Sequence, residues 1–273
     1  MLMYEEQIIL KGKKPGNKSL ILVGVHGNEK CGINAIEKIL PTLKIESGEI
    51  IIMYGSPEAI IKNVRYVEAN LNRMFKKDEE ISQLDRRSLE FKRSRKIMES
   101  MKNVDVLLDV HASNNPNSMP FIICENNAKD IILNLGIKNV IYGFDTIEPG
   151  GTDYYMNNIG KIGICVECGY ANDPNSDTVA EMAIMKFLIA QGHISGINQN
   201  NIIKEMRVDN LYLTKSNSFI LEKNFADFEK ISLGQKIGID GDVEIFSKYD
   251  GFILFAHNTD FMGAEAFITG KYL

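Results

Sequence analysis

The apolar run at residues 19–25 is the feature that most constrains the fold. Its sequence, S-L-I-L-V-G-V, makes both faces of an extended chain apolar, which is typical of a strand buried inside a parallel sheet. The run ends in a glycine-flanked turn that carries His26 and Glu29 three residues apart. A buried strand that brings an imidazole and a carboxylate to one turn is a common start of a metal site. Gly27 is expected to take a backbone conformation that other residues resist.

Apolar runs along the first two thirds of the chain predict five more strands, at 49–54, 104–110, 120–124, 140–142 and 162–167. Apolar residues at helical spacing predict the main helices at 31–40, 86–101 and 178–191. Residues 65–75 have no clean period and are expected to be irregular. Because strands alternate with helices and several strands are apolar on both faces, the predicted fold class is α/β with a mostly parallel central sheet.

The pattern of apolar residues changes after Gly192. A polar linker at 196–201 is followed by short alternating runs interrupted by glycines. This pattern predicts an all-β domain, most simply a small sandwich or barrel. We therefore divide the chain into a catalytic domain at 1–196 and a smaller all-β C-terminal domain at 197–273.

Composition excludes several functional classes. The net charge of −5 gives no reason to expect nucleic acid or an anionic membrane as a partner, and the basic run at 92–96 is interpreted as a solvated helix face. No apolar run reaches the ~20 residues of a membrane span, and residues 1–10 do not resemble a targeting signal. Four cysteines suggest a reducing compartment, and Cys165 and Cys168, on a predicted strand, are interpreted as packing thiols. The expected location is the cytoplasm.

His111 is the candidate third ligand beside His26 and Glu29. It follows another buried run, and the carboxyl ends of parallel strands gather at one edge of a sheet. Two histidines and one glutamate form a common protein ligand set for catalytic Zn²⁺. Asp109, two residues earlier, could hold the His111 ring. A lone histidine is usually structural, but two of only four here follow strand ends. His193 and His257 are expected to be exposed or hydrogen-bonded.

Glu167 follows the apolar run at 162–166, where an ionised carboxylate is costly to bury without a purpose. It could serve as a general base, and the alternative is a glutamate paired with a nearby Arg or Lys. Arg65, Asn72 and Arg73 form a further group. They suit the binding of a carboxylate and the stabilisation of an oxyanion, whereas spacing alone favours a solvated loop.

Four motifs in register resemble the succinylglutamate desuccinylase/aspartoacylase family, relatives of the zinc carboxypeptidases. They are G-V-H-G-N-E at 24–29, R-Y-V-E-A-N-L-N-R-M-F at 65–75, D-V-H-A-S at 109–113 and G-I-C-V-E-C-G at 163–169. The resemblance implies a mixed, mostly parallel, zinc carboxypeptidase-like sheet flanked by helices, and a smaller all-β C-terminal domain. It also implies zinc ligands His26, Glu29 and His111, a general base Glu167, a carbonyl-polarising Arg65, and Asn72 with Arg73 on a substrate carboxylate.

Departures from aspartoacylase concern the choice of substrate. An Arg that precedes the catalytic Glu in that enzyme is missing from residues 153–158, and a substrate-contacting Tyr is replaced around Phe261. Both differences count against N-acetylaspartate as the substrate.

The resulting hypothesis is a zinc-dependent amidohydrolase, with one Zn²⁺ per chain, that acts on amide bonds other than peptide bonds. It would cleave a small N-acyl amino acid, as a desuccinylase or deacetylase does, by Glu-assisted attack of metal-bound water. The alternatives are a metallocarboxypeptidase or peptide amidase, and a metal-holding binding module without turnover. The expected partner is a small molecule with a carboxylate rather than nucleic acid or membrane, and a homodimer is among the expectations.

Overall fold

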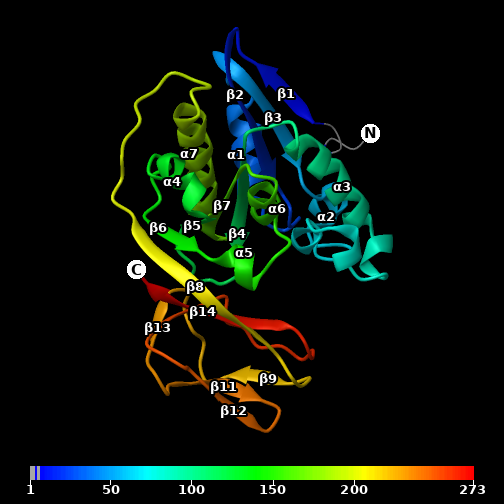
Figure 1. The fold of residues 1–273 in the computed structure, drawn as a ribbon, viewed down its shortest axis with the longest axis vertical. Coiled ribbons are helices and arrows are strands. Elements are labelled where there is room, and N and C mark those ends of the chain that lie inside the picture. The colour runs from blue at the N-terminus through cyan, green and yellow to red at the C-terminus, as the bar shows by residue number, and fades with distance from the viewer. Residues whose placement is uncertain (1–3, 5–6) are drawn as a thin grey trace.

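A computed structural model of the chain describes residue 4 and residues 7–273 (Figure 1). Its central feature is an 11-stranded sheet with the order β1-β3-β2-β4-β7-β5-β6-β8-β14-β13-β10. The strands of the first two thirds of the chain are β1 (Ile8–Lys11), β2 (Lys14–Val23), β3 (Ser47–Tyr54), β4 (Val106–Ser113), β5 (Phe121–Cys124), β6 (Asn139–Tyr142) and β7 (Ile162–Tyr170). This architecture confirms the predicted α/β class with a mixed sheet.

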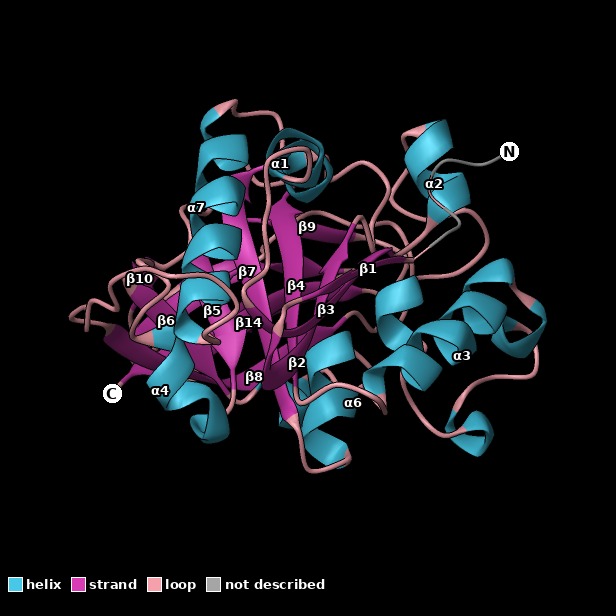
Figure 2. Cartoon of the chain, turned by 90° about the horizontal axis from the view of Figure 1, so that it is seen from above, coloured by secondary structure: helices cyan, strands magenta, loops and turns pink. Residues whose placement is uncertain are grey.

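Helices cover both faces of this sheet (Figure 2). They are α1 (Cys31–Ile39), α2 (Pro57–Lys62), α3 (Leu89–Met101), α4 (Lys129–Ile132), α5 (Phe144–Ile147), α6 (Thr152–Asn158) and α7 (Asn175–Ala190). Among the described helices, none is long and apolar enough to cross a bilayer.

Alternating side chains of β2 explain why helices are needed on both faces. Ile21 and Val23 pack into one core with α1 and α7, whereas Leu20 and Leu22 pack into a second core with α3 and α6. Successive side chains of a strand point to opposite faces, so a strand that is apolar at every position must be covered twice. The run at 19–25, which is apolar on both faces, therefore requires a fold in which helices cover the sheet on both sides.

The middle of the sheet is parallel, as predicted: β3, β2, β4 and β7 pair in parallel register. The sheet is mixed because β5 pairs antiparallel with β7, and because β1, which was not predicted, pairs antiparallel with β3. The helix expected at 86–101 begins only at Leu89. The Ser88 hydroxyl accepts a hydrogen bond from the Phe91 N–H at 3.1 Å and caps the helix there.

The C-terminal part is all-β, as predicted, but its strands belong to two sheets. Four of them extend the large sheet: β8 (Lys204–Leu213), β10 (Glu229–Ile231), β13 (Gly251–Leu254) and β14 (Glu265–Tyr272). The other three form a small separate sheet: β9 (Phe219–Leu221), β11 (Lys236–Asp240) and β12 (Val243–Phe246). The long strand β8 pairs with β6 on one side and β14 on the other, so it joins this part to the rest of the molecule (Figure 1).

Candidate active site

The turn after β2 places His26 and Glu29 at the carboxyl edge of the sheet. The Glu29 N–H donates to the His26 carbonyl at 3.2 Å, and the Gly27 N–H donates to the Arg65 carbonyl at 3.2 Å. The backbone conformation expected of Gly27 is found at Gly24 instead, whose φ is 65°. Gly27 is needed for a different reason, since a Cβ there would lie 2.0 Å from the backbone of Ala59. The turn therefore depends on both glycines.

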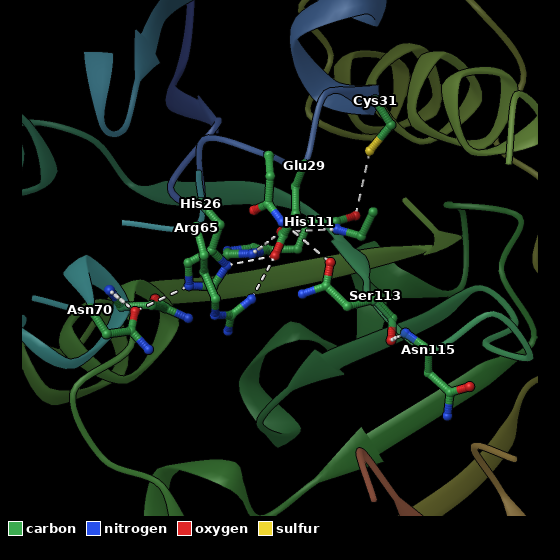
Figure 3. A network of polar contacts seen from close by, with 12 residues as sticks. His26, Glu29, Cys31, Arg65, Asn70, His111, Ser113 and Asn115 are labelled. Carbon is green, nitrogen blue, oxygen red and sulfur yellow. Dashed lines mark hydrogen bonds and ion pairs between the residues drawn. The ribbon is translucent and has the colours of Figure 1, made fainter. Parts of the chain in front are cut away.

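His26, Glu29 and His111 converge at one buried point, as predicted. Their candidate ligand atoms all lie within 4.8 Å of one another, and these three residues could hold a metal ion. The Glu29 carboxylate lies between the two rings, with Oε1 at 2.7 Å from His26 Nδ1 and Oε2 at 2.9 Å from His111 Nδ1 (Figure 3). His111 lies within β4 rather than after it, because the pairing with β7 continues through His111 and Glu167.

The outer nitrogen of each imidazole has an acceptor. His26 Nε2 lies 3.1 Å from the Asn70 Oδ1 atom, and His111 Nε2 lies 3.0 Å from Asp109 Oδ2. Asn70 Oδ1 also accepts from the Asn72 N–H, and Asp109 also accepts from the Thr152 hydroxyl. Because both partners accept, they can hold a proton on Nε2 of each ring, which would leave the two Nδ1 atoms beside Glu29 free to bind a metal ion. This is the ring orientation that a metal ligand needs.

Glu167 lies beside this cluster on β7, with 9% of its surface exposed. Its Oε2 atom is buried and has no hydrogen-bond partner among the described residues. Burial, and after it the charge of Glu29, raise the pKa of Glu167 to about 8 against the opposing charge of His111. The sequence left open that Glu167 pairs with a nearby Arg or Lys. Among the described residues, no Arg or Lys forms a direct ion pair with Glu167.

Arg65 reaches the same point from the irregular segment. Its Nη1 donates to Glu29 Oε1 at 2.9 Å, and 40% of its side chain is exposed. Arg65 thus lies at the boundary between the buried cluster of His26, Glu29 and His111 and the open space in front of it.

Arg73 and Asn72 lie on the short helical turn Leu71–Arg73 but face other partners. The Asn72 side-chain oxygen accepts from the Thr152 N–H at 3.3 Å. The Arg73 guanidinium is paired with two carboxyl groups, those of Glu148 and Glu265. Its part in binding a substrate carboxylate stays a prediction, and such binding would require Arg73 to exchange these partners.

All seven predicted site residues line one cavity of about 980 Å³. The cavity is closed partly by the C-terminal β structure, which contributes Phe225, Phe255, His257, Glu265 and Ile268 among others. His257 is exposed there with its Nδ1 near the Phe255 carbonyl, and His193 is buried and hydrogen-bonded to Ser19 and Ser47, as expected of both. Cys165 and Cys168 are buried free thiols.

Sequence reasoning missed Asn70 and Glu90, which hold the irregular segment in place. Glu90, on α3, is 2% exposed and accepts hydrogen bonds from the Val67, Glu68 and Ala69 N–H groups. The basic run at 92–96 predicts a solvated helix face, which gives no hint of a buried Glu90 beside it. The signal that could have found Glu90 is its place in the first turn of α3, two residues before that run.

Glu90→Gln is expected to lower the melting temperature by roughly 4–8 °C. The amide would turn N–H donors toward backbone N–H groups, which costs about 2 kcal/mol, and a protein of this size loses roughly 2–4 °C per kcal/mol. Glu99→Gln, on the exposed side of the same helix, should change the melting temperature little, because the ion pair that the described part of the chain gives Glu99, with Lys102, lies at the surface. Equal melting temperatures of the two variants would refute this role of Glu90.

Comparison with known proteins identifies the family. The model of the succinylglutamate desuccinylase/aspartoacylase catalytic domain matches residues 15–191. The chain belongs to the succinylglutamate desuccinylase/aspartoacylase family. The matched range holds every one of the seven predicted site residues.

Individual members of the family show how far the likeness extends. A probable aspartoacylase from Nostoc sp. is 27% identical over 166 residues, which cover 56% of this chain and 55% of that protein, so the match spans about half the length of that relative. The succinylglutamate desuccinylase from Vibrio cholerae has a TM-score of 0.78 at 16% identity, over 94% of this chain and 82% of that one. A succinylglutamate desuccinylase/aspartoacylase from Rhodobacter sphaeroides has a TM-score of 0.74 at 17% identity, over 98% and 89%. The structural likeness thus includes the C-terminal β structure.

Proposed function

We propose that this protein is a zinc-dependent amidohydrolase that cleaves the amide bond of a small N-acyl amino acid. The observation that carries the proposal is the meeting of His26, Glu29 and His111 in one cavity with the buried carboxyl group of Glu167. Membership of the desuccinylase/aspartoacylase family supports the same reaction class.

The donor set fits zinc. Two imidazole Nδ1 atoms and a carboxylate are ligands that Zn²⁺ accepts in catalytic sites with three protein ligands. Asn70 and Asp109 accept at the outer nitrogens of the two rings, which is the arrangement that would orient metal-bound imidazoles. A bound zinc ion supplies Lewis-acid chemistry, in that it polarises a carbonyl and lowers the pKa of water to about 7.

Glu167 and Arg65 perform the remaining chemistry in this proposal. Glu167 takes a proton from the attacking water and returns it to the nitrogen of the leaving amine, so that the C–N bond breaks and a carboxylic acid and an amine are released. Arg65, half exposed beside Glu29, stabilises the oxyanion that forms on the acyl carbonyl. Asn72 and Arg73, which line the same cavity, are proposed as substrate contacts.

The cavity favours small substrates over peptide chains. A metallocarboxypeptidase or peptide amidase with the same residues needs an open cleft, whereas here β14 and the segment around Phe255 form part of the cavity wall. A binding module without turnover would not need an unpaired carboxyl oxygen at Glu167. Both observations support the amidohydrolase.

Assay of the full, zinc-loaded chain against a panel of N-acyl amino acids and short peptides tests the proposal. The panel should vary the acyl group (acetyl, succinyl, formyl) and the amine, and each release of amine is measured directly. We expect hydrolysis of at least one N-acyl amino acid and little of the peptides. Preference for peptides would favour the peptidase, and stoichiometric zinc with no hydrolysis of any amide would favour the binding module.

A further inference from the structure

Asp109 is a buried carboxylate beside the His111 ring, and only one of its two oxygens is hydrogen-bonded. The residue is 0% exposed, and its Oδ1 atom has no partner among the described residues. Its Oδ2 atom lies 3.0 Å from His111 Nε2 and accepts from the Thr152 hydroxyl at 2.6 Å. A buried carboxylate is costly unless it is hydrogen-bonded. In the described part of the chain, the Thr152 hydroxyl is therefore the group that holds this carboxylate together with the imidazole.

Thr152 also contacts the other side of the site, through its backbone. Its N–H donates to Asn72 Oδ1 at 3.3 Å. The Asn72 N–H donates in turn to Asn70 Oδ1 at 3.0 Å, and the same oxygen lies 3.1 Å from His26 Nε2. A continuous chain of hydrogen-bonded residues thus joins the outer nitrogens of the two imidazoles, and Thr152 lies in the middle of that chain.

The hydroxyl of Thr152 is not used to cap its own helix. Thr152 is the first residue of α6, and a threonine at the start of a helix commonly serves as the cap. Here the cap position belongs to Gly151, and no side chain caps the helix. Because Thr152 is 1% exposed and β-branched, its χ1 angle is restricted and its hydroxyl has a fixed direction. The hydroxyl therefore serves Asp109, which lies 43 residues away in the sequence.

We infer that Thr152 is a positioning residue, which orients the His111 ring through Asp109 and holds Asn72 through its N–H. The inference rests on the proposed amidohydrolase function, in which His111 is a zinc ligand and Asn72 a substrate contact. A metal-bound imidazole is oriented by the acceptor at its outer nitrogen, and that acceptor must itself be held in place. One residue at the start of α6 thereby connects the metal site to a substrate contact.

Two pairs of side chains, each with and without a hydroxyl, test the inference in the full chain. The wild type is compared with Thr152→Val, and Thr152→Ser with Thr152→Ala. Loss of the outer partner of a metal ligand weakens metal binding about 10–100-fold, and since Thr152 acts one contact further out, we expect about tenfold weaker zinc binding in Thr152→Val. Thr152→Ser should bind zinc nearly as the wild type does, whereas Thr152→Ala should resemble Thr152→Val. Competition with a chromogenic chelator measures these affinities without any substrate.

Turnover at saturating zinc gives a second readout that a purely structural role would not change. Loss of the hydroxyl should lower kcat about tenfold, because small misplacements of catalytic groups cost this much or more. KM should stay nearly unchanged, because Asn72 is held by the backbone N–H, which every variant keeps. Thr146→Val, which changes an exposed threonine of the neighbouring helix α5, is the matched control and should change neither zinc affinity nor kcat.

The outcomes separate this inference from the proposed function. Wild-type zinc affinity in Thr152→Val, or equal affinities of the serine and alanine variants if Thr152→Val does not fold, would overturn the inference, while hydrolysis by the wild type would still support the amidohydrolase. Weaker zinc binding in the variants without a hydroxyl, together with no hydrolysis of any amide by the wild type, would support the positioning of His111 and overturn the proposed function.

Discussion

Glu167→Gln is expected to lower kcat by roughly 10²–10⁴-fold while the protein keeps one zinc ion per chain. The amide has nearly the same shape as the carboxyl group, so the packing around β7 is preserved, but it cannot take up a proton from water. Glu167 is not among the three residues that could hold the metal. Turnover measured on the best substrate of the panel, together with the zinc content of the same preparation, checks this expectation.

A surface glutamate provides the control for this variant. Glu181→Gln, on α7, removes a carboxylate that pairs with Lys38 far from the cavity, and it should leave both kcat and zinc content unchanged. Full activity of Glu167→Gln would refute its role as the base. Loss of zinc from Glu167→Gln would assign this side chain to metal binding instead.

His111→Ala is expected to release zinc and, with it, all activity. The substitution leaves two protein ligands instead of three, and it also leaves Asp109 buried without its imidazole partner. Loss of an outer hydrogen bond to a ligand alone weakens metal binding about 10–100-fold. Loss of the ligand itself should therefore weaken zinc binding by more than about 100-fold. Competition with a chromogenic chelator measures this affinity.

His257→Ala is the matched control, because His257 lines the same cavity but is exposed, and among the described residues its ring is hydrogen-bonded to the Phe255 carbonyl alone. We expect it to bind zinc with the wild-type affinity. If both histidine variants bound zinc as the wild type does, the metal site proposed at His26, Glu29 and His111 would be wrong.

Local sequence signals were sufficient to predict the core of the fold and the convergence of His26, Glu29 and His111. Strands that are apolar on both faces, such as residues 20–23 of β2, can only be central strands of a layered sheet, and their carboxyl ends must lie together. His26 and His111 follow or end two such runs on adjacent strands. Their meeting is therefore a consequence of a pattern that is visible in the sequence.

The partners that complete the site carry no such local signal. Asn70 lies in a segment without periodicity, and Glu90 lies beside a basic run that resembles an ordinary solvated helix face. Glu265 contacts Arg73 across 192 residues of sequence. Such contacts depend on how elements that are far apart in the sequence pack together, and a local sequence pattern cannot reveal them. The same reason explains why the pairing of Arg73 was not foreseen.

The shared strand β8 also limits how a ligand can enter. Residues 204–207 of β8 form a parallel ladder with β6, and the same strand continues into an antiparallel ladder with β14. The C-terminal part cannot swing away as a rigid flap without breaking this ladder. We therefore expect a ligand to reach the cavity without detachment of the C-terminal part, and we expect the two parts of the chain to unfold as a single cooperative unit.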